Sequence, residues 1–98
     1  ALASNEEVME AITSATIAPN PVMGATANIS FMLKQEANVV VKVYDRTGNS
    51  VAVINGGKRS AGMITQHISV ATLKSDTYYV IVEADGVAIA KNNLMVLH

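Results

Sequence analysis

The sequence predicts an all-β fold in which two antiparallel sheets pack face to face, and three observations lead to this prediction. After Thr13, apolar residues alternate with other residues at a period of two, which is typical of strands with one buried face. Turn-forming residues occur at short intervals between these segments. The longest uninterrupted apolar run covers only residues 78–82, far below the roughly 18 residues that a membrane-spanning helix needs.

Each expected strand ends at a turn signal rich in glycine, aspartate, asparagine or serine. Seven short strands separated by close turns predict an antiparallel immunoglobulin-like β-sandwich with Greek-key connections, and the periodicity excludes a helical bundle. The expected strands cover residues 13–18, 25–33, 37–45, 50–54, 63–69, 77–84 and 87–97, and the turns fall at 45–49, 55–58, 60–62, 74–76 and 84–86.

Composition narrows the class of protein. The chain has 98 residues, enough for one domain with one core, and half of them are apolar. Only 15% are charged, against about 25% in an average soluble domain, so disorder of the whole chain is excluded. A net charge of −1 does not favour binding to nucleic acid or to a membrane surface. Disulfide and thiolate chemistry are excluded because the chain has no cysteine.

The first twelve residues differ from the rest. Glu6, Glu7 and Glu10 make residues 1–12 acidic, and the start of this stretch resembles a capped helix terminus. So short a stretch cannot hold a helix alone in water. We therefore expect residues 1–12 to form a flexible acidic leader or linker and residues 13–98 to form the β-sandwich domain.

Two details predict features inside the sandwich. Gly48 follows Asp45 at the turn position where a positive φ costs glycine least, which indicates a hairpin. A tyrosine at the start of the sixth strand is typical of the corner of Greek-key sandwiches, where its hydroxyl bonds to the backbone upstream. Tyr78 and Tyr79 both qualify by position, and we expect Tyr78, with alternate residues after it, to lie on the buried face of a central strand.

Catalytic and metal-binding patterns are weak in this sequence. The two histidines, His67 and His98, have no spacing that fits a metal cluster or a catalytic triad. The acidic residues of the body lie at or near predicted turns, where aspartate bonds its own backbone. The two glycines at 56–57 are not followed by the other residues of a phosphate-binding loop. Lys58 and Arg59 are predicted to lie in a solvated loop. The sequence therefore predicts a noncatalytic module without cofactor or metal.

Five short motifs follow one another along residues 17–98: a Pro-Asn-Pro joint, a Tyr-Asp-x-x-Gly hairpin, an Ala-Gly turn, a leucine before a corner tyrosine, and a basic residue before a final apolar strand. In this order the motifs resemble the type A C-terminal sorting domains of the type IX secretion system. They fall on Pro19, Asn20 and Pro21; on Tyr44, Asp45 and Gly48; on Ala61 and Gly62; on Leu73 and Tyr78; and on Lys91 before Leu94, Met95, Val96 and Leu97.

One position departs from the family pattern. Asp76 stands where the family has a glycine shortly before the corner tyrosine. Aspartate tolerates left-handed backbone better than most residues, so we expect the turn to survive.

The resemblance implies a noncatalytic sorting signal. An N-terminal cargo domain would reach the periplasm by its own signal peptide, and shuttle proteins and the outer-membrane translocon would recognise the folded domain. A surface sortase would remove the domain, and the cargo would stay at the cell surface or be released. The leader at residues 1–12 would then be the tether around the processing point, and a stop codon is expected directly after His98. No nucleic acid, transmembrane segment or cofactor is implied.

Two other interpretations compete with the sorting signal. One is an immunoglobulin-like or fibronectin-III-like accessory module of a secreted enzyme, for adhesion or carbohydrate binding, which would need exposed aromatic rings. The other is a structural spacer or protein-binding module. A fibronectin corner is partly echoed by Leu73, Thr77 and Tyr79, although the proline of that corner is missing.

The resemblance also suggests roles for the two ends of the domain. Pro19 and Pro21 fix φ and make the joint stiff, so that the domain would be held at an angle to what precedes it. In the last strand, Leu94 and Val96, grouped with Lys91, are expected to alternate with Met95 and Leu97. We expect one pair to pack inside and the other to be available as an edge or terminal epitope for a receptor.

Overall fold

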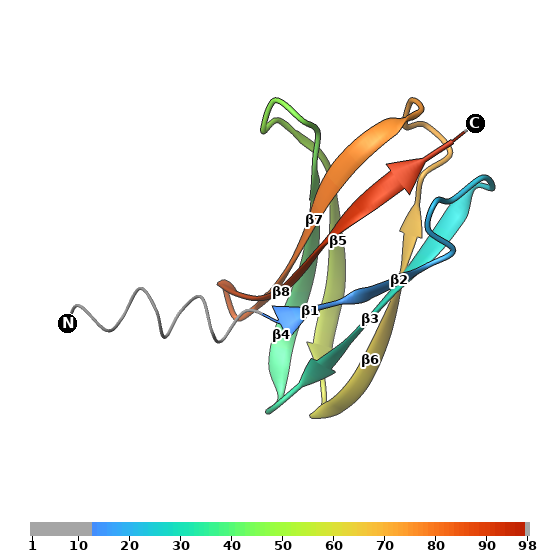
Figure 1. The fold of residues 1–98 in the computed structure, drawn as a ribbon. Helices are drawn as coiled ribbons and strands as arrows, with labels where there is room; N and C mark the ends of the chain where they lie inside the picture. The colour runs from blue at the N-terminus through green and yellow to red at the C-terminus, as the bar shows by residue number, and fades with distance from the viewer. Residues whose placement is uncertain (1–12, 98) are drawn as a thin grey trace.

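The computed structural model describes residues 13–97, which form two packed β-sheets and contain no helix that could span a membrane (Figure 1). The acidic leader predicted at residues 1–12 lies outside the described residues. The prediction of an all-β sandwich is confirmed. The strands are β1 (Thr13–Ser14), β2 (Thr16–Ala18), β3 (Thr26–Leu33), β4 (Ala37–Tyr44), β5 (Ser50–Arg59), β6 (Gly62–Ser69), β7 (Asp76–Ala84) and β8 (Val87–Val96).

Strand order shows how the chain divides between the sheets. The larger sheet runs β1-β8-β7-β4-β5 and the smaller sheet runs β2-β3-β6. All pairings between these strands are antiparallel except that of β1 with β8, which is parallel. Two hairpins, β4-β5 and β7-β8, lie in the larger sheet, and the chain crosses between sheets from β3 to β4, from β5 to β6 and from β6 to β7 (Figure 1). The central strand of the larger sheet is β7, which lies between β8 and β4.

The core lies between the sheets and is built mainly from aliphatic side chains. Alternate residues of the longer strands point inward, as the period of two predicts. On β7, Tyr78, Val80 and Val82 are buried, and this prediction is confirmed. The largest fully buried side chains are Ile29, Ile68, Leu94, Val22, Val39, Val41, Val43, Val70, Val80, Val82 and Val96. Burial of these apolar surfaces is the main force that holds the sheets together.

The first predicted strand, residues 13–18, is divided between the two sheets. β1 pairs with β8 of the larger sheet, whereas β2 pairs with β3 of the smaller sheet, so the chain changes sheets at Ala15. It then returns, because Val22 forms an isolated parallel bridge with Val96. One segment thus covers the side of the sandwich between β3 and β8, where the two sheets would otherwise have open edges.

The turn predicted at residues 55–58 is wrong, because β5 continues through these residues to Arg59. Val39 pairs with Gly57 and Val40 pairs with Asn55, so the residue between them is the extra residue of a β-bulge. Gly57 has φ +77°, which glycine adopts most easily. Lys58 therefore lies in a strand instead of the predicted loop, as does Arg59.

Candidate functional site

Residues 15–22, which we call the strap, run along the outer edge of β8 and include the Pro-Asn-Pro joint. The two prolines have no backbone N–H, so they cannot donate to a strand ladder. The side chain of Asn20 forms hydrogen bonds to β8 in their place. Its Oδ1 accepts a hydrogen bond from the Met95 N–H at 2.9 Å. Its Nδ2 donates to the Asn93 carbonyl at 3.0 Å. One carboxamide thus supplies the acceptor and donor that a strand residue would supply.

Backbone bonds continue the strap on both sides of Asn20. The Ala15 N–H donates to the Lys91 carbonyl at 3.0 Å, and the Val22 N–H donates to the Met95 carbonyl at 2.8 Å. The Leu97 N–H in turn donates to the Val22 carbonyl at 2.9 Å. The peptide bonds that precede both prolines of the strap are cis. The outer edge of β8 is therefore covered from Lys91 to Leu97.

Leu94 and Val96 are buried while Met95 and, just after β8, Leu97 are exposed, as the predicted alternation requires. The grouping of Lys91 with Leu94 and Val96 is wrong, because Lys91 is exposed on the face of Met95. Of the two alternatives, an edge or a terminal epitope, the edge is wrong because the strap occupies it, whereas the terminal epitope stays a prediction. The part of β8 that a partner could contact is therefore its exposed side chains. Lys91 is exposed on the same strand and forms no ion pair with any residue from 13 to 97.

The β4–β5 hairpin is held by the carboxylate of Asp45. Its Oδ1 accepts hydrogen bonds from the Thr47 hydroxyl at 2.6 Å, the Thr47 N–H at 2.9 Å and the Asn49 N–H at 3.0 Å. The Thr47 hydroxyl and then the Asn49 N–H hold the pKa of Asp45 below its ordinary value. Gly48 has φ +90° and donates its N–H to the Asp45 carbonyl, which confirms the predicted hairpin. Tyr44 ends β4 beside this loop with its side chain half-buried.

The corner tyrosine is Tyr78. Its hydroxyl donates to the Lys74 carbonyl at 2.7 Å, and its ring is only 5% exposed. Tyr79 points to the opposite face and is 45% exposed, so it is not the corner residue. Leu73, in the loop before β7, is half-buried and packs against the core.

Asp76 does not need the left-handed backbone that the family glycine suggested. Among residues 13–97, the non-glycine residue with positive φ is Asp85, in the two-residue turn between β7 and β8. Asp76 is instead the first residue of β7, where its carboxylate accepts the Thr77 N–H at 2.8 Å. It also pairs with the guanidinium of Arg46 at 3.1 Å. This ion pair joins the hairpin motif to the corner motif.

The motif residues do not converge on one site. Ala61 precedes β6 and Gly62 is its first residue, at the end of the sandwich opposite the C-terminus (Figure 1). The strap and β8 form one group, and the hairpin and corner form a second. The sequence-based interpretation missed Asn92, whose amide donates to the Ala15 carbonyl. Two adjacent asparagines after Lys91, between apolar stretches of the strand, were the available signal.

Catalytic groups do not gather in the part of the chain that the structure describes. Within residues 13–97, no three histidine or acidic side chains are placed to hold a metal ion, and the described core contains no buried charged residue. His67 lies on β6, where its Nδ1 shares a hydrogen bond with the amide oxygen of Asn28 on β3. This contact gives His67 a structural role as the cross-strand partner of Asn28.

In a comparison with protein families, residues 16–96 match the family described as the secretion system C-terminal sorting domain. The matched range begins in the strap, ends in β8 and includes every strand from β2 onward. No curated protein matches the chain.

Proposed function

The chain belongs to the family of type IX secretion system C-terminal sorting domains, and on this premise we propose that it guides an N-terminal cargo from the periplasm to the outer-membrane translocon. A sorting signal of this kind implies export and contact with the secretion machinery. The domain acts as a folded address and carries out no catalysis itself. The proposed partners are the translocon, its shuttle proteins and a surface sortase.

The family match over residues 16–96 carries this proposal. It spans both the strap, with Asn20, and β8, with Lys91 and the apolar residues from Leu94 onward. The structure supports the proposal physically, because these motif residues build one rigid, hydrogen-bonded edge. A receptor that reads a folded surface requires such pre-organisation, since ordering flexible groups on binding lowers affinity.

We further propose that the sandwich domain is residues 13–98, that residues 1–12 are the tether to the cargo, and that a sortase cuts upstream of Thr13. A sortase requires an extended, accessible backbone. From Thr13 onward the backbone enters the ladder with β8, and beyond it the strap is hydrogen-bonded through Val22. Cleavage within the strap would first require its removal from β8.

The experiment is to fuse residues 13–98 behind a periplasmic fluorescent protein in a host with type IX machinery. The fusion is expected to reach the cell surface, measured as fluorescence that external protease removes. The same fluorescent protein without the domain is the control and is expected to stay in the periplasm. Periplasmic retention of the intact fusion would contradict the proposed function.

A second fusion begins with the native residues 1–12, so that the processing point is present. Mass spectrometry of the released cargo is expected to show a new C-terminus before Thr13. A cut at or after Thr13 would contradict the placement of the processing point. A surface cargo still joined to its domain would contradict removal by a sortase while leaving export intact.

The adhesion or carbohydrate-binding alternative needs several exposed aromatic rings for stacking. Of the four aromatic residues, Phe31 and Tyr78 are buried, Tyr44 is half-buried and Tyr79 is exposed. One exposed ring is a poor platform for a sugar chain, so this observation favours the sorting signal.

A further inference from the structure

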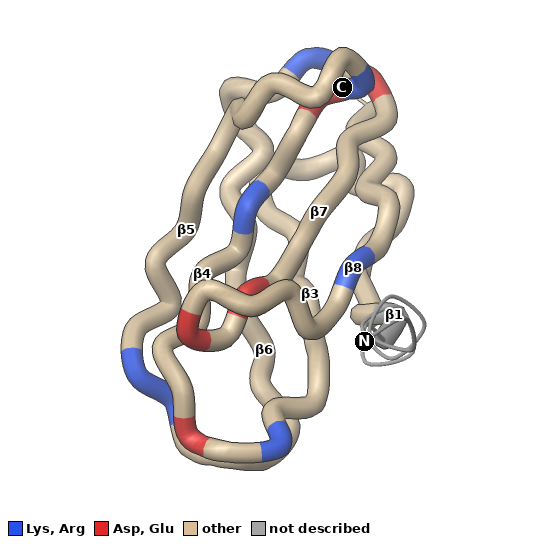
Figure 2. The backbone as a smooth tube through the Cα atoms, turned by 90° about the vertical axis from the view of Figure 1, so that its left-hand side faces the viewer, with Lys and Arg blue, Asp and Glu red and all other residues tan. Residues whose placement is uncertain are grey.

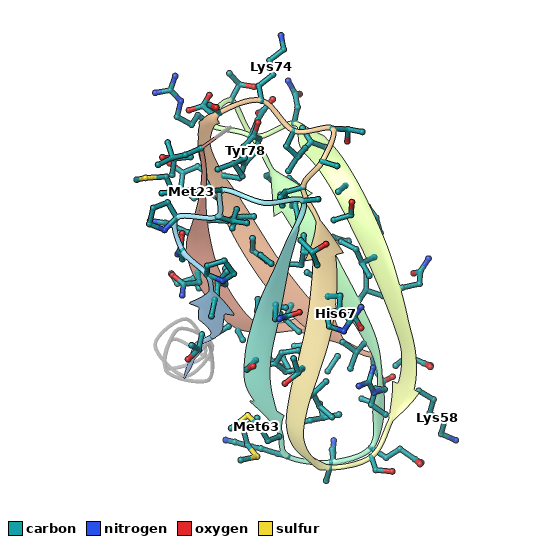
Figure 3. The ribbon with its side chains drawn as sticks, turned by 90° about the vertical axis from the view of Figure 1, so that its right-hand side faces the viewer. Met23, Lys58, Met63, His67, Lys74 and Tyr78 are labelled. Atoms are coloured by element: carbon teal, nitrogen blue, oxygen red, sulfur yellow. The ribbon has the colours of Figure 1, made fainter. Side chains whose placement is uncertain are left out.

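The outer faces of the two sheets differ in chemistry. Side chains on the outer face of β3 and β6 are mostly threonine, serine, asparagine and histidine, and the exposed face of β6 carries His67 (Figure 3). Met32 and Met63, which pair with each other at one end, are the two apolar exceptions. The outer face of the larger sheet instead carries aromatic and aliphatic side chains along its centre. Single exposed apolar side chains are common on folded domains, but a contiguous group of them marks a contact surface more often.

Cross-strand pairing places these side chains in two adjacent rows. The first row runs from Asn93 through Tyr79 to Tyr44, across β8, β7 and β4. The second row runs from Lys91 through Ile81 and Lys42 to Val53 on β5. We call this surface the tyrosine face and define it by Tyr44, Val53, Tyr79, Ile81, Lys91 and Asn93.

Two apolar side chains of the tyrosine face are exposed and two are half-buried. Val53 is 53% exposed and Tyr79 is 45% exposed, whereas Tyr44 and Ile81 are half-buried beside them. A concavity of about 510 Å³ lies between β7 and β8, lined by Tyr79, Ile81, Lys91 and Asn93 with the backbone neighbours Val80 and Asn92. Tyrosine is enriched among the residues that supply most of the binding energy at protein interfaces, and such residues tend to pack in pockets.

Charge indicates what kind of partner would cover the tyrosine face. Lys42 is neutralised by Glu83 at 3.2 Å, on the same face. Lys91 borders the concavity, and within residues 13–97 no ion pair neutralises it. Figure 2, which looks onto the larger sheet, shows basic positions in blue on β4 and on β8. A second copy would bring another unneutralised Lys91 to the same interface, which disfavours self-association.

We propose that the tyrosine face is the docking surface for a protein of the export machinery, which places an apolar side chain in the concavity beside Tyr79 and a carboxylate against Lys91. This inference rests on the proposed function and adds which surface the receptor reads. The covered edge of β8 excludes strand addition there, so β8 is read through its side chains.

The test uses the fluorescent fusion of residues 13–98 with single substitutions on each face. Tyr79→Ser and Lys91→Glu change the tyrosine face, while Met63→Ser and Lys34→Glu are matched controls, because both are exposed and lie away from it. Each tyrosine-face variant is expected to lower the surface-exposed fraction of intact fusion about tenfold, the effect of losing one strong interface residue. Both controls are expected to be exported like the wild type. Melting temperatures of all four purified domains are expected to lie within a few degrees of the wild type, because the substituted positions are exposed.

Several results would overturn the inference. Export of Tyr79→Ser and Lys91→Glu at the wild-type level would show that the tyrosine face is not read. Equal losses in the controls would show that any surface change blocks export. A purified wild-type domain that sediments as a dimer at about 100 μM, and as a monomer after Tyr79→Ser, would assign the face to a second copy. Retention of the wild-type fusion would instead remove the proposed function itself.

Discussion

The two edges of the larger sheet, at β8 and at β5, are protected in different ways. At β8, the strap supplies hydrogen bonds along the edge and replaces missing proline donors by the side chain of Asn20. At β5, no further strand of residues 13–97 pairs with the edge, which is interrupted by a bulge at Gly56 and ends in Lys58 and Arg59. Exposed edges tend to pair with other chains, and bulges and charges discourage this. The edge at β8 is thus closed by hydrogen bonds to one defined partner, the strap. The edge at β5 has no such partner, and its bulge and charges only make pairing with another chain less favourable.

The largest effect is expected at Tyr78, on the central strand that both edges depend on. Tyr78→Ala removes a buried ring and should cost about 3–5 kcal/mol, much of the stability of a small domain. The isolated domain should be unfolded or nearly so by circular dichroism. Tyr78→Phe keeps the ring, loses the bond to Lys74 and should cost only about 1 kcal/mol. Melting of Tyr78→Ala within a few degrees of wild type would contradict the corner assignment.

Asn20→Ala tests the covered edge. It removes both hydrogen bonds to β8 and should cost about 1–2 kcal/mol in urea unfolding, since each bond is partly replaced by water. Hydrogen exchange of the Met95 amide should speed up at the same time. Asn20→Asp keeps the acceptor for Met95 and should lose less, whereas Asn55→Ala on the open edge should change little. Unaltered protection of Met95 in Asn20→Ala would show that the strap holds without the side chain.

Gly56→Ala tests the open edge. An added Cβ would lie 3.2 Å from the Val39 carbonyl oxygen and 3.1 Å from Oε1 of Gln66, so the bulge must shift. The side chain of Gln66 can move but the Val39 backbone cannot, and we expect a loss of about 1 kcal/mol by thermal or urea unfolding. Gly24→Ala, where the Cβ meets nothing within 4 Å, is the control and should be neutral or slightly stabilising. Equal stability of the two variants would mean that the open edge tolerates added bulk.

The smallest effect is expected from the Asp45 carboxylate, in the turn that leads to the open edge. Hydrogen bonds lower its pKa below the ordinary 3.8, so it stabilises the fold above that value. This contribution is lost as pH falls through the lowered pKa. Melting temperatures measured from about pH 7 to about pH 2 should fall less in Asp45→Asn than in the wild type. Parallel curves for the two proteins would contradict the proposed role of the charge.

Local sequence predicted most of the fold because it depends on short-range rules. The period of two located the strands, and Asp45 with Gly48 located a hairpin whose bonds are all within five residues. Tyr78 and Tyr79 could not be separated by position alone. Strand register decided between them, because adjacent residues of a strand point to opposite faces.

Two predictions failed for the same reason. Residues 55–58 contain turn residues, yet Asn55 pairs with Val40 and Gly57 pairs with Val39, so the partner strand absorbs the glycines as a bulge. The final strand was expected to offer an edge, yet residues far earlier in the chain cover it. In the first case the partner strand β4 lies just before β5 in the chain, and in the second the strap lies about 70 residues before β8; in both cases the pairing depends on register, which the local residue types do not encode.

The sequence by itself determined the strand-forming segments, the corner and hairpin motifs, and the resemblance to sorting domains, because each depends on residue types at short, fixed spacings. Only the tertiary structure decided that Asn20 bonds to β8, that β1 and β2 belong to different sheets, and that Tyr79, Ile81 and Lys91 share one face. The first two features depend on contacts between segments far apart in the chain, and the third depends on the register of the β7–β8 hairpin. Register is set by how all the buried faces pack together, which is a property of the whole sandwich.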